Sequence, residues 1–286
     1  MKKAIIVVFL MAILSFISFK IEAQEPIFNE LDNVYVKEHV ANRKPIPYPT
    51  IREADIMWSK RVWRIIDLRE RINLQMYYPT TQMDDRFNLV NLLLNGILDG
   101  KIQAYDPDND DEFKVLMTYE RVLKNLGAGK DTTETENPDT GLTEIRIVEA
   151  ELKDQTQEVK QFLVKELWFF DRNRSCLDVR IIGICPIREY LKKDDTVGKK
   201  RICWVNFNEA RPLFARYEIF NQGNDAQRRS FDDLFMSRFF GSYIVKESNI
   251  YNNRQIDTYA VGVEAMIESE RVKYDIFRME HDMWEF

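Results

Sequence analysis

Three stretches rich in β-branched and aromatic residues stand close together in the second half of the chain. They are QFLVKELWFF at 161–170, LDVRIIGICPI at 177–187 and RICWVNF at 201–207. Side chains of these types favour strands, where they pack on a pleated surface. The polar segment DRNRS, residues 171–175, would join the first two stretches as a hairpin. The sequence therefore predicts a small antiparallel β-sheet in the middle of the chain.

The segment IREADIMWSKRVWRIIDLRERINL, residues 51–74, is predicted as a helix that precedes this sheet. Thr50 and Glu53 have the spacing of a capping box. Apolar residues then recur at helical intervals, and these are Ile51, Ala54, Trp58, Val62, Ile65, Leu68 and Ile72. The alternative is a strand over residues 63–69 that follows a shorter helix.

Four more helices are predicted from caps and apolar spacing. Before the sheet, Asp84 or Asp85 can cap a helix with Phe87, Val90, Leu94 and Ile97 on one face, which Gly100 ends, and a short strand follows at 101–105. After the sheet, three helices are predicted. Asn208 caps the first, with Pro212 still in its first turn, and Ser230 with Asp233 marks the start of the second. Asp257 caps the third, which contains Tyr259, Val263, Met266 and Ile267. The segment 242–251 between the last two helices is extended in pattern. The predicted fold class is α+β, with a helical N-terminal lobe, a small antiparallel β-sheet in the middle and helices returning at the C-terminus.

The N-terminus has the pattern of a secretory signal peptide. Lys2 and Lys3 precede an apolar run over residues 4–19, and a small residue, Ala23, stands before Gln24. We therefore expect residues 1–23 to be removed by cleavage between Ala23 and Gln24. The apolar run is shorter than the roughly 20 residues that a membrane-spanning helix prefers.

The mature chain is predicted to have four parts. Residues 24–49 form an extended, proline-containing arm, because prolines at 45, 47 and 49 favour polyproline II geometry. Residues 50–126 form a mainly helical N-terminal lobe. Residues 127–142 contain almost no large apolar side chain and form a flexible linker or loop. Residues 143–286 form a C-terminal α+β lobe.

Charge and residue counts exclude several kinds of site. The net charge is −6, and cleavage would remove three lysines and one glutamate, so an acidic chain of this kind is unsuited to non-specific nucleic-acid binding. Only two histidines are present, which disfavours histidine-based catalysis or metal binding. The acidic run DPDNDDE, residues 106–112, lacks the glycine and the closing glutamate of an EF-hand loop and is predicted as a solvated turn. No catalytic, cofactor or metal residues are expected.

The three cysteines, Cys176, Cys185 and Cys203, contain no CxxC pair. An exported chain can oxidise a pair of thiols. Cys185 and Cys203 fall in consecutive predicted strands and could form a cross-strand disulfide. The alternative is that both are unreactive core residues.

Four stretches combine aromatic and basic residues: WSKRVWR at 58–64, WFFDRNR at 168–174, RRSFDDLFMSRFF at 228–240 and MEHDMWEF at 279–286. Arginine and aromatic side chains are enriched at protein interfaces. The candidate interface residues are Trp58, Arg61, Trp63, Arg64, Arg228, Arg229, Trp284 and Phe286. The alternative is an ordinary core with solvated basic neighbours. Trp63 lies off the helical stripe, so we expect it to meet another chain or the C-terminal lobe, and Trp63→Ala to weaken assembly more than folding.

Four long stretches resemble the gliding motility family GldN, whose counterpart in non-gliding bacteria of the phylum is PorN. They are READIMWSKRVWRIIDLRERIN, WFFDRNRSCLDVRIIGICPI, NDAQRRSFDDLFMSRFFGSYIVKESN and HDMWEF. The resemblance implies a component of the type IX secretion system of Bacteroidota, located in the periplasm and associated with the outer membrane through a partner. The implied partners are an outer-membrane lipoprotein of the GldK/PorK kind, the periplasmic domain of a GldM/PorM-like motor protein, and further copies of the chain in a ring.

This resemblance implies no catalytic residues, no cofactor and no direct membrane span. Together with the export signal and the aromatic–basic stretches, it favours a non-enzymatic ring or scaffold subunit. The alternatives are a periplasmic enzyme acting on cell-wall or surface glycan, and a periplasmic small-molecule binding protein.

Overall fold

The computed structural model describes residues 42–83, 86–108, 111–128, 156–192, 194, 196–221, 223–224 and 227–284, together with the backbone of 130–136 and 143–149. Residues 43–286 form one compact unit. The expected signal peptide, its cleavage point and the first part of the expected arm lie outside the described residues, as does Phe286.

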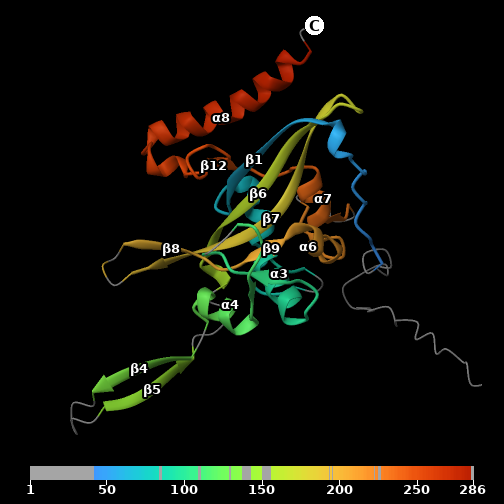
Figure 1. The fold of residues 1–286 in the computed structure, drawn as a ribbon. Coiled ribbons are helices and arrows are strands. Elements are labelled where there is room, and N and C mark those ends of the chain that lie inside the picture. Colours follow the sequence, from blue (N-terminus) through green and yellow to red (C-terminus); the bar gives the residue numbers. More distant parts are fainter. Residues whose placement is uncertain are drawn as a thin grey trace, which may run out of the picture. The chain divides into compact units, whose positions relative to one another are not determined.

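An eight-stranded sheet forms the centre of this unit, in the order β12-β1-β6-β7-β9-β2-β3, with β8 paired to β7. Its strands are β1 (Ile56–Asp67), β2 (Ala104–Tyr105), β3 (Leu116–Met117), β6 (Val159–Asp171), β7 (Cys176–Leu191), β8 (Val197–Arg201), β9 (Trp204–Asn206) and β12 (Tyr243–Glu247). Every pairing in this sheet is antiparallel. Figure 1 shows β6 and β7 as long strands running side by side.

The three stretches that predicted strands are confirmed as β6, β7 and β9, and residues 172–175 turn β6 back onto β7. The sheet is larger than predicted, because it also takes strands from the first third of the chain and from near the C-terminus. Strands of the expected N-terminal and C-terminal lobes therefore share one sheet.

The helix predicted over residues 51–74 is wrong. Only a single 3-10 turn, Glu53–Asp55, precedes the twelve-residue strand β1, and the N-cap residue Arg52 makes no side-chain cap. The alternative strand over 63–69 overlaps the end of β1. The reason is tertiary: β1 pairs with β6 on one side and with β12 on the other, and its β-branched and aromatic residues suit such a position. Apolar residues at helical spacing could not reveal these two neighbours.

Helices cover one face of the sheet at its centre. The helices are α2 (Leu74–Tyr77), α3 (Leu89–Leu98), α4 (Tyr119–Leu126), α6 (Phe207–Phe214), α7 (Phe231–Met236) and α8 (Val263–Asp282), and a 3-10 turn, η3, covers Ile256–Thr258. Helix α3 confirms the second predicted helix, although its cap is Asn88, whose side chain accepts a hydrogen bond from the Asn91 amide at 2.7 Å. The capping box of Ser230 and Asp233 at α7 is confirmed, with both hydrogen bonds present at 3.0 and 3.2 Å.

Two other predicted helix starts are displaced. Helix α6 is capped by Asn206 rather than Asn208, so Pro212 lies inside the helix instead of in its first turn. Asp257 lies in the 3-10 turn η3, and the long C-terminal helix begins at Val263 after Gly262, which has a positive φ of 63°.

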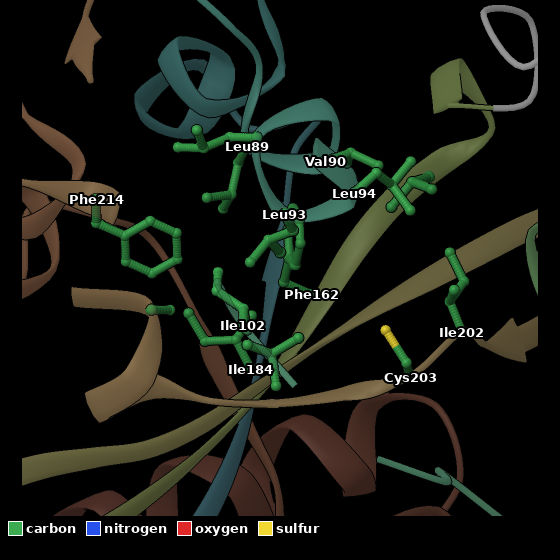
Figure 2. Packing of buried hydrophobic residues seen from close by; sticks show 14 of the residues in the cluster. Leu89, Val90, Leu93, Leu94, Ile102, Phe162, Ile184, Ile202, Cys203 and Phe214 are labelled. Atoms are coloured by element: carbon green, nitrogen blue, oxygen red, sulfur yellow. The ribbon is translucent and has the colours of Figure 1, made fainter. Parts of the chain in front are cut away.

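The main hydrophobic core lies between the central strands and helices α3, α6 and α7. Figure 2 shows leucines of α3, including Leu89 and Leu93, beside Phe162 of β6 and Ile184 of β7, with Phe214 of α6 closing the cluster. A second cluster joins α8 to β1 and β12 through Val62, Ile244, Val272 and Ile276. A third cluster contains Trp63, Leu163, Cys185, Ile187 and Trp204. Because successive side chains of a strand point to opposite faces, Trp63 lies on the other face of the sheet from Val62.

The expected flexible linker over residues 127–142 contains a strand. Strand β4 (Lys130–Glu136) pairs antiparallel with β5 (Thr143–Glu149). The segment DTTETE has three threonines, whose β-branched side chains favour strands even without large apolar residues. Residues 137–142 lie outside the described part of the chain.

Candidate interaction surface

Helix α8 is held on the sheet by one of its faces. Ser269, Val272 and Ile276 are buried against β1, β12 and η3, at the 3- and 4-residue spacing of one helical stripe. The Ser269 hydroxyl oxygen accepts a hydrogen bond from the Ile244 amide of β12 at 3.0 Å. The helix therefore has a defined rotation on the sheet, which determines the residues that face away from it (Figure 1).

A second apolar stripe lies on the outward side of α8. We call it the α8 stripe, and its members are Val263, Met266, Ile267, Tyr274, Phe277 and Trp284. Each of these side chains is more than half exposed, and the rings of Tyr274 and Phe277 lie 6.3 Å apart. A surface helix ordinarily carries one apolar stripe, which faces its own core. A second, exposed one is typical of a surface that binds another protein.

Charged residues flank the α8 stripe, and acids outnumber bases. The acids in α8 are Glu264, Glu268, Glu270, Asp275, Glu280 and Asp282, and the bases are Arg271, Lys273 and Arg278. Arg271 is held between Glu268 at 2.6 Å and Asp275 at 2.5 Å, so its charge is already compensated within the helix. The surroundings of the stripe are therefore acidic, and they are complementary to a basic partner.

The sequence placed only part of this surface. Trp284 was a candidate interface residue, and it is 65% exposed at the end of the stripe. Val263, Met266 and Ile267 were predicted as helix positions without a function, and Tyr274 and Phe277 were not singled out. The signal that could have identified them is a second set of apolar residues at helical spacing, offset from the buried set.

The aromatic candidates of β1 lie inside the protein. Trp63 is 3% exposed and packs with Leu163, Cys185 and Trp204, all of which belong to the C-terminal part of the chain. Trp63 was predicted to meet either another chain or the C-terminal lobe, and in the structure it contacts residues of the C-terminal lobe. Trp58 is half-buried against the cluster that holds α8.

The basic candidates differ in their surroundings. Arg61 is exposed at the edge of a polar cleft. Arg64 donates from Nε to the Ser242 hydroxyl at 2.9 Å. Arg228 forms an ion pair with Glu218 at 3.5 Å, and the Arg229 guanidinium lies 5.5 Å from the centroid of the Phe239 ring. Arg64, Arg228 and Arg229 therefore interact within the chain.

The described end of the expected arm lies on the same chain. The Tyr48 ring lies between the Arg211 guanidinium, 4.3 Å from its centroid, and that of Arg180, at 4.8 Å. Arg211 also donates to the Ile46 carbonyl and Arg180 to the Pro49 carbonyl, each at 2.6 Å. These contacts hold residues 46–49 against α6 and β7 of their own subunit.

All three cysteines are free thiols in the structure. Cys185 belongs to the cluster around Trp63, whereas Cys203 belongs to the main core on the other face of the sheet. Burial raises the pKa of both thiols, that of Cys203 to about 12. Two side chains that enter different clusters are poorly oriented for a disulfide.

Among the residues that the structure describes, no helix combines the length and apolar character needed to cross a membrane. A search among curated proteins finds no match. The family model described as "Gliding motility associated protein GldN" matches residues 51–285, which include the whole sheet and the whole of α8. A match over that much of the chain shows that this protein belongs to the GldN family of gliding-motility-associated proteins.

Proposed function

We propose that this protein is a non-enzymatic ring or scaffold subunit of the type IX secretion and gliding machinery, located in the periplasm. In this proposal it is held at the outer membrane by a lipoprotein of the GldK/PorK kind. It links the lipoprotein ring to the periplasmic domain of a GldM/PorM-like motor protein. Membership of the GldN family supports the general assignment. The observation that carries the scaffold proposal is the α8 stripe, a row of exposed apolar side chains on the side of α8 that faces away from its own core.

We assign the α8 stripe to a partner with an apolar patch and a basic rim. A second copy of α8 is a poor occupant, because two helices with an excess of acids would face each other. A lipoprotein, a motor domain or a different face of a neighbouring subunit can supply the basic rim. Rings are built from heterologous contacts, in which two different patches of each subunit meet.

Copurification tests this assignment. The mature chain is expressed with a tagged lipoprotein partner, and the tag is used to recover the complex. Phe277→Asp places a charge in the middle of the stripe and should lower recovery at least tenfold, because a desolvated carboxylate at an interface is costly. The melting temperature of the variant should match that of the wild type, since Phe277 is 59% exposed.

The matched control is Ile250→Asp, which introduces the same charge at an exposed apolar residue outside α8. It should leave recovery unchanged. If Phe277→Asp and Ile250→Asp copurify equally well with the lipoprotein, the stripe is not the contact with the lipoprotein. If a strain lacking the gene still secretes its substrates and glides, the scaffold role itself is refuted.

A further inference from the structure

A polar cleft of about 370 Å³ opens where β1, β6 and β12 meet the loop over residues 106–113. It lies on the face of the sheet that carries Trp63, away from the cluster that holds α8. Four cations line it, and each comes from a different strand: Arg61 from β1, Lys165 from β6, Arg201 from β8 and Lys246 from β12. The acids in its lining, Asp108, Asp111 and Glu112, all come from the loop. The sheet therefore supplies a basic floor, and the loop supplies acidic groups above it.

The basic floor of the cleft results from the register in which the strands of the sheet pair. Lys246 of β12 is paired with Trp63 of β1, Trp63 with Lys165 of β6, and Lys165 with Gly183 of β7. The Nζ atoms of Lys246 and Lys165 lie 4.3 and 5.6 Å from the centroid of the Trp63 ring. Two ammonium groups thus lie close to one aromatic ring, an arrangement that concentrates positive charge.

Lys165 is the most constrained member of this row. Its residue is 5% exposed, and burial lowers the pKa of its ammonium group. The Phe113 ring packs directly over Gly183, where a larger residue would collide with it, and also lies 5.5 Å from the Lys165 Nζ atom. An ammonium group has three donor hydrogens, and the Asp111 carbonyl oxygen accepts one from Lys165.

Asp111 acts as an internal anion in this cleft. Its carboxylate lies 2.9 Å from the Lys246 Nζ atom, while its carbonyl contacts Lys165. The acidic run at 106–112 was predicted as a solvated turn, and this holds for Asp108 and Glu112, which are exposed, but not for Asp111, which is half-buried. Asp106 is itself buried and binds Arg121 at 2.8 Å.

The described residues of the loop do not satisfy every donor of the cleft. Among the described residues, Arg61 and Arg201 make no ion pair, and the buried Trp63 Nε1 atom has no acceptor. A buried donor without an acceptor has a free-energy cost of roughly 1–3 kcal/mol. The cleft therefore offers ammonium and guanidinium donors beyond those that Asp111 occupies.

We propose that this cleft binds a small organic polycarboxylate, and that Asp111 occupies part of the site until the ligand replaces it. Carboxylate oxygens form strong, charge-assisted hydrogen bonds with ammonium and guanidinium groups. Several carboxylates on one small molecule can reach separate cations at once, and the volume of the cleft lies within the range of small-ligand sites. This site is additional to the protein contact assigned to α8.

Calorimetric titration of citrate into the purified mature chain tests the proposal. We expect saturable binding that weakens at least tenfold in Arg61→Met, a change at an exposed residue that the fold should tolerate. Lys246→Met should have a similar effect, and Lys246→Arg should restore binding. Asp111→Asn should tighten binding severalfold, because the internal competitor loses its charge.

The matched control is Lys273→Met, which removes an exposed cation on α8 and should leave citrate binding unchanged. A Kd weaker than about 10 mM for both the wild type and Asp111→Asn overturns the proposal. Equal weakening by Arg61→Met and Lys273→Met overturns it as well, because the effect would then reflect overall charge. Sulfate binding as tightly as citrate would show a general anion effect and would refute the assignment to polycarboxylates.

Discussion

The substitution Trp63→Ala tests whether Trp63 is a core residue or an interface residue. Trp63 is 3% exposed, and its ring packs with Leu163 and Trp204, while the Nζ atoms of Lys165 and Lys246 lie 5.6 and 4.3 Å from the ring centroid. Replacing a buried tryptophan by alanine in a core costs about 3–5 kcal/mol, because the transfer free energy is lost and a cavity remains. For a domain of this size each kcal/mol lowers the melting temperature by about 2–4 °C, so we expect a decrease of roughly 6–20 °C. The sequence alone had indicated the reverse, an effect on assembly larger than that on folding.

Thermal unfolding followed by circular dichroism measures this decrease, with Trp284→Ala as the matched control. Trp284 is 65% exposed at the end of the α8 stripe, so its removal should change the melting temperature by less than about 2 °C while it lowers copurification with the partner. If Trp63→Ala melts within about 2 °C of the wild type and copurifies poorly, the assignment of Trp63 to the core is refuted.

Three further changes test the interior. Glu166 is fully buried and accepts hydrogen bonds from the half-buried Arg238 at 2.9 Å, so Glu166→Gln weakens hydrogen bonds between charged groups and should cost about 1.5–3 kcal/mol in urea unfolding; a loss below about 1 kcal/mol contradicts this. A hydrogen bond from Arg69 lowers the pKa of Asp67 to about 2 in the folded state from 3.8, so its stabilisation is present above pH 4 and is lost as pH falls toward 2. Asp67→Asn should therefore cost about 1–2 kcal/mol at pH 7, after screening by solvent, and less than about 0.5 kcal/mol at about pH 2, where the folded-state carboxyl is half protonated; a difference independent of pH would refute the linkage. Burial raises the pKa of Cys203 to about 12, so iodoacetamide at pH 8 should modify Cys203 only after unfolding, and rapid labelling of the native chain would show otherwise.

Local signals in the sequence predicted the elements that local interactions form. The β6–β7 hairpin is one example, because its two long apolar stretches are joined by the short turn over 172–175. The capping box of Ser230 and Asp233 is another, since both of its hydrogen bonds lie within one turn of α7. Such contacts need no information from the rest of the chain.

Strand β1 shows where local reasoning fails. Its apolar residues fit a helical interval as well as a strand, and the choice depends on neighbours about 100 and 180 residues away in sequence, as the pairs Trp63–Lys165 and Trp63–Lys246 show. The helical N-terminal lobe was predicted from this helix and from the one that precedes Gly100, and of the two only the second is present, as α3. The short strand β4 was missed for the opposite reason, since its segment contains threonines and charges but no large apolar residue.

For the surfaces with a proposed function, too, some features could be predicted from the sequence and others depend on tertiary contacts. The sequence predicted an exported chain with aromatic and basic stretches, and it carried the family resemblance that the match over residues 51–285 confirms. It could not distinguish the aromatic residues that complete the core from those that remain exposed. Ser269, Val272 and Ile276 anchor one side of α8 on the sheet, and only this docking leaves Phe277 exposed.

By itself, then, the sequence determined the composition of the strands, the local caps and turns, and membership of the GldN family, because each of these depends on residues that are near one another along the chain or on the pattern of the whole. Tertiary structure alone decided that β1 is a strand, that α8 exposes a second apolar stripe, and that Lys165 and Lys246 converge on Trp63. The physical reason is that burial and charge clustering depend on which distant segments pair, and the free energy of that pairing exceeds the small local preferences that a sequence pattern reveals.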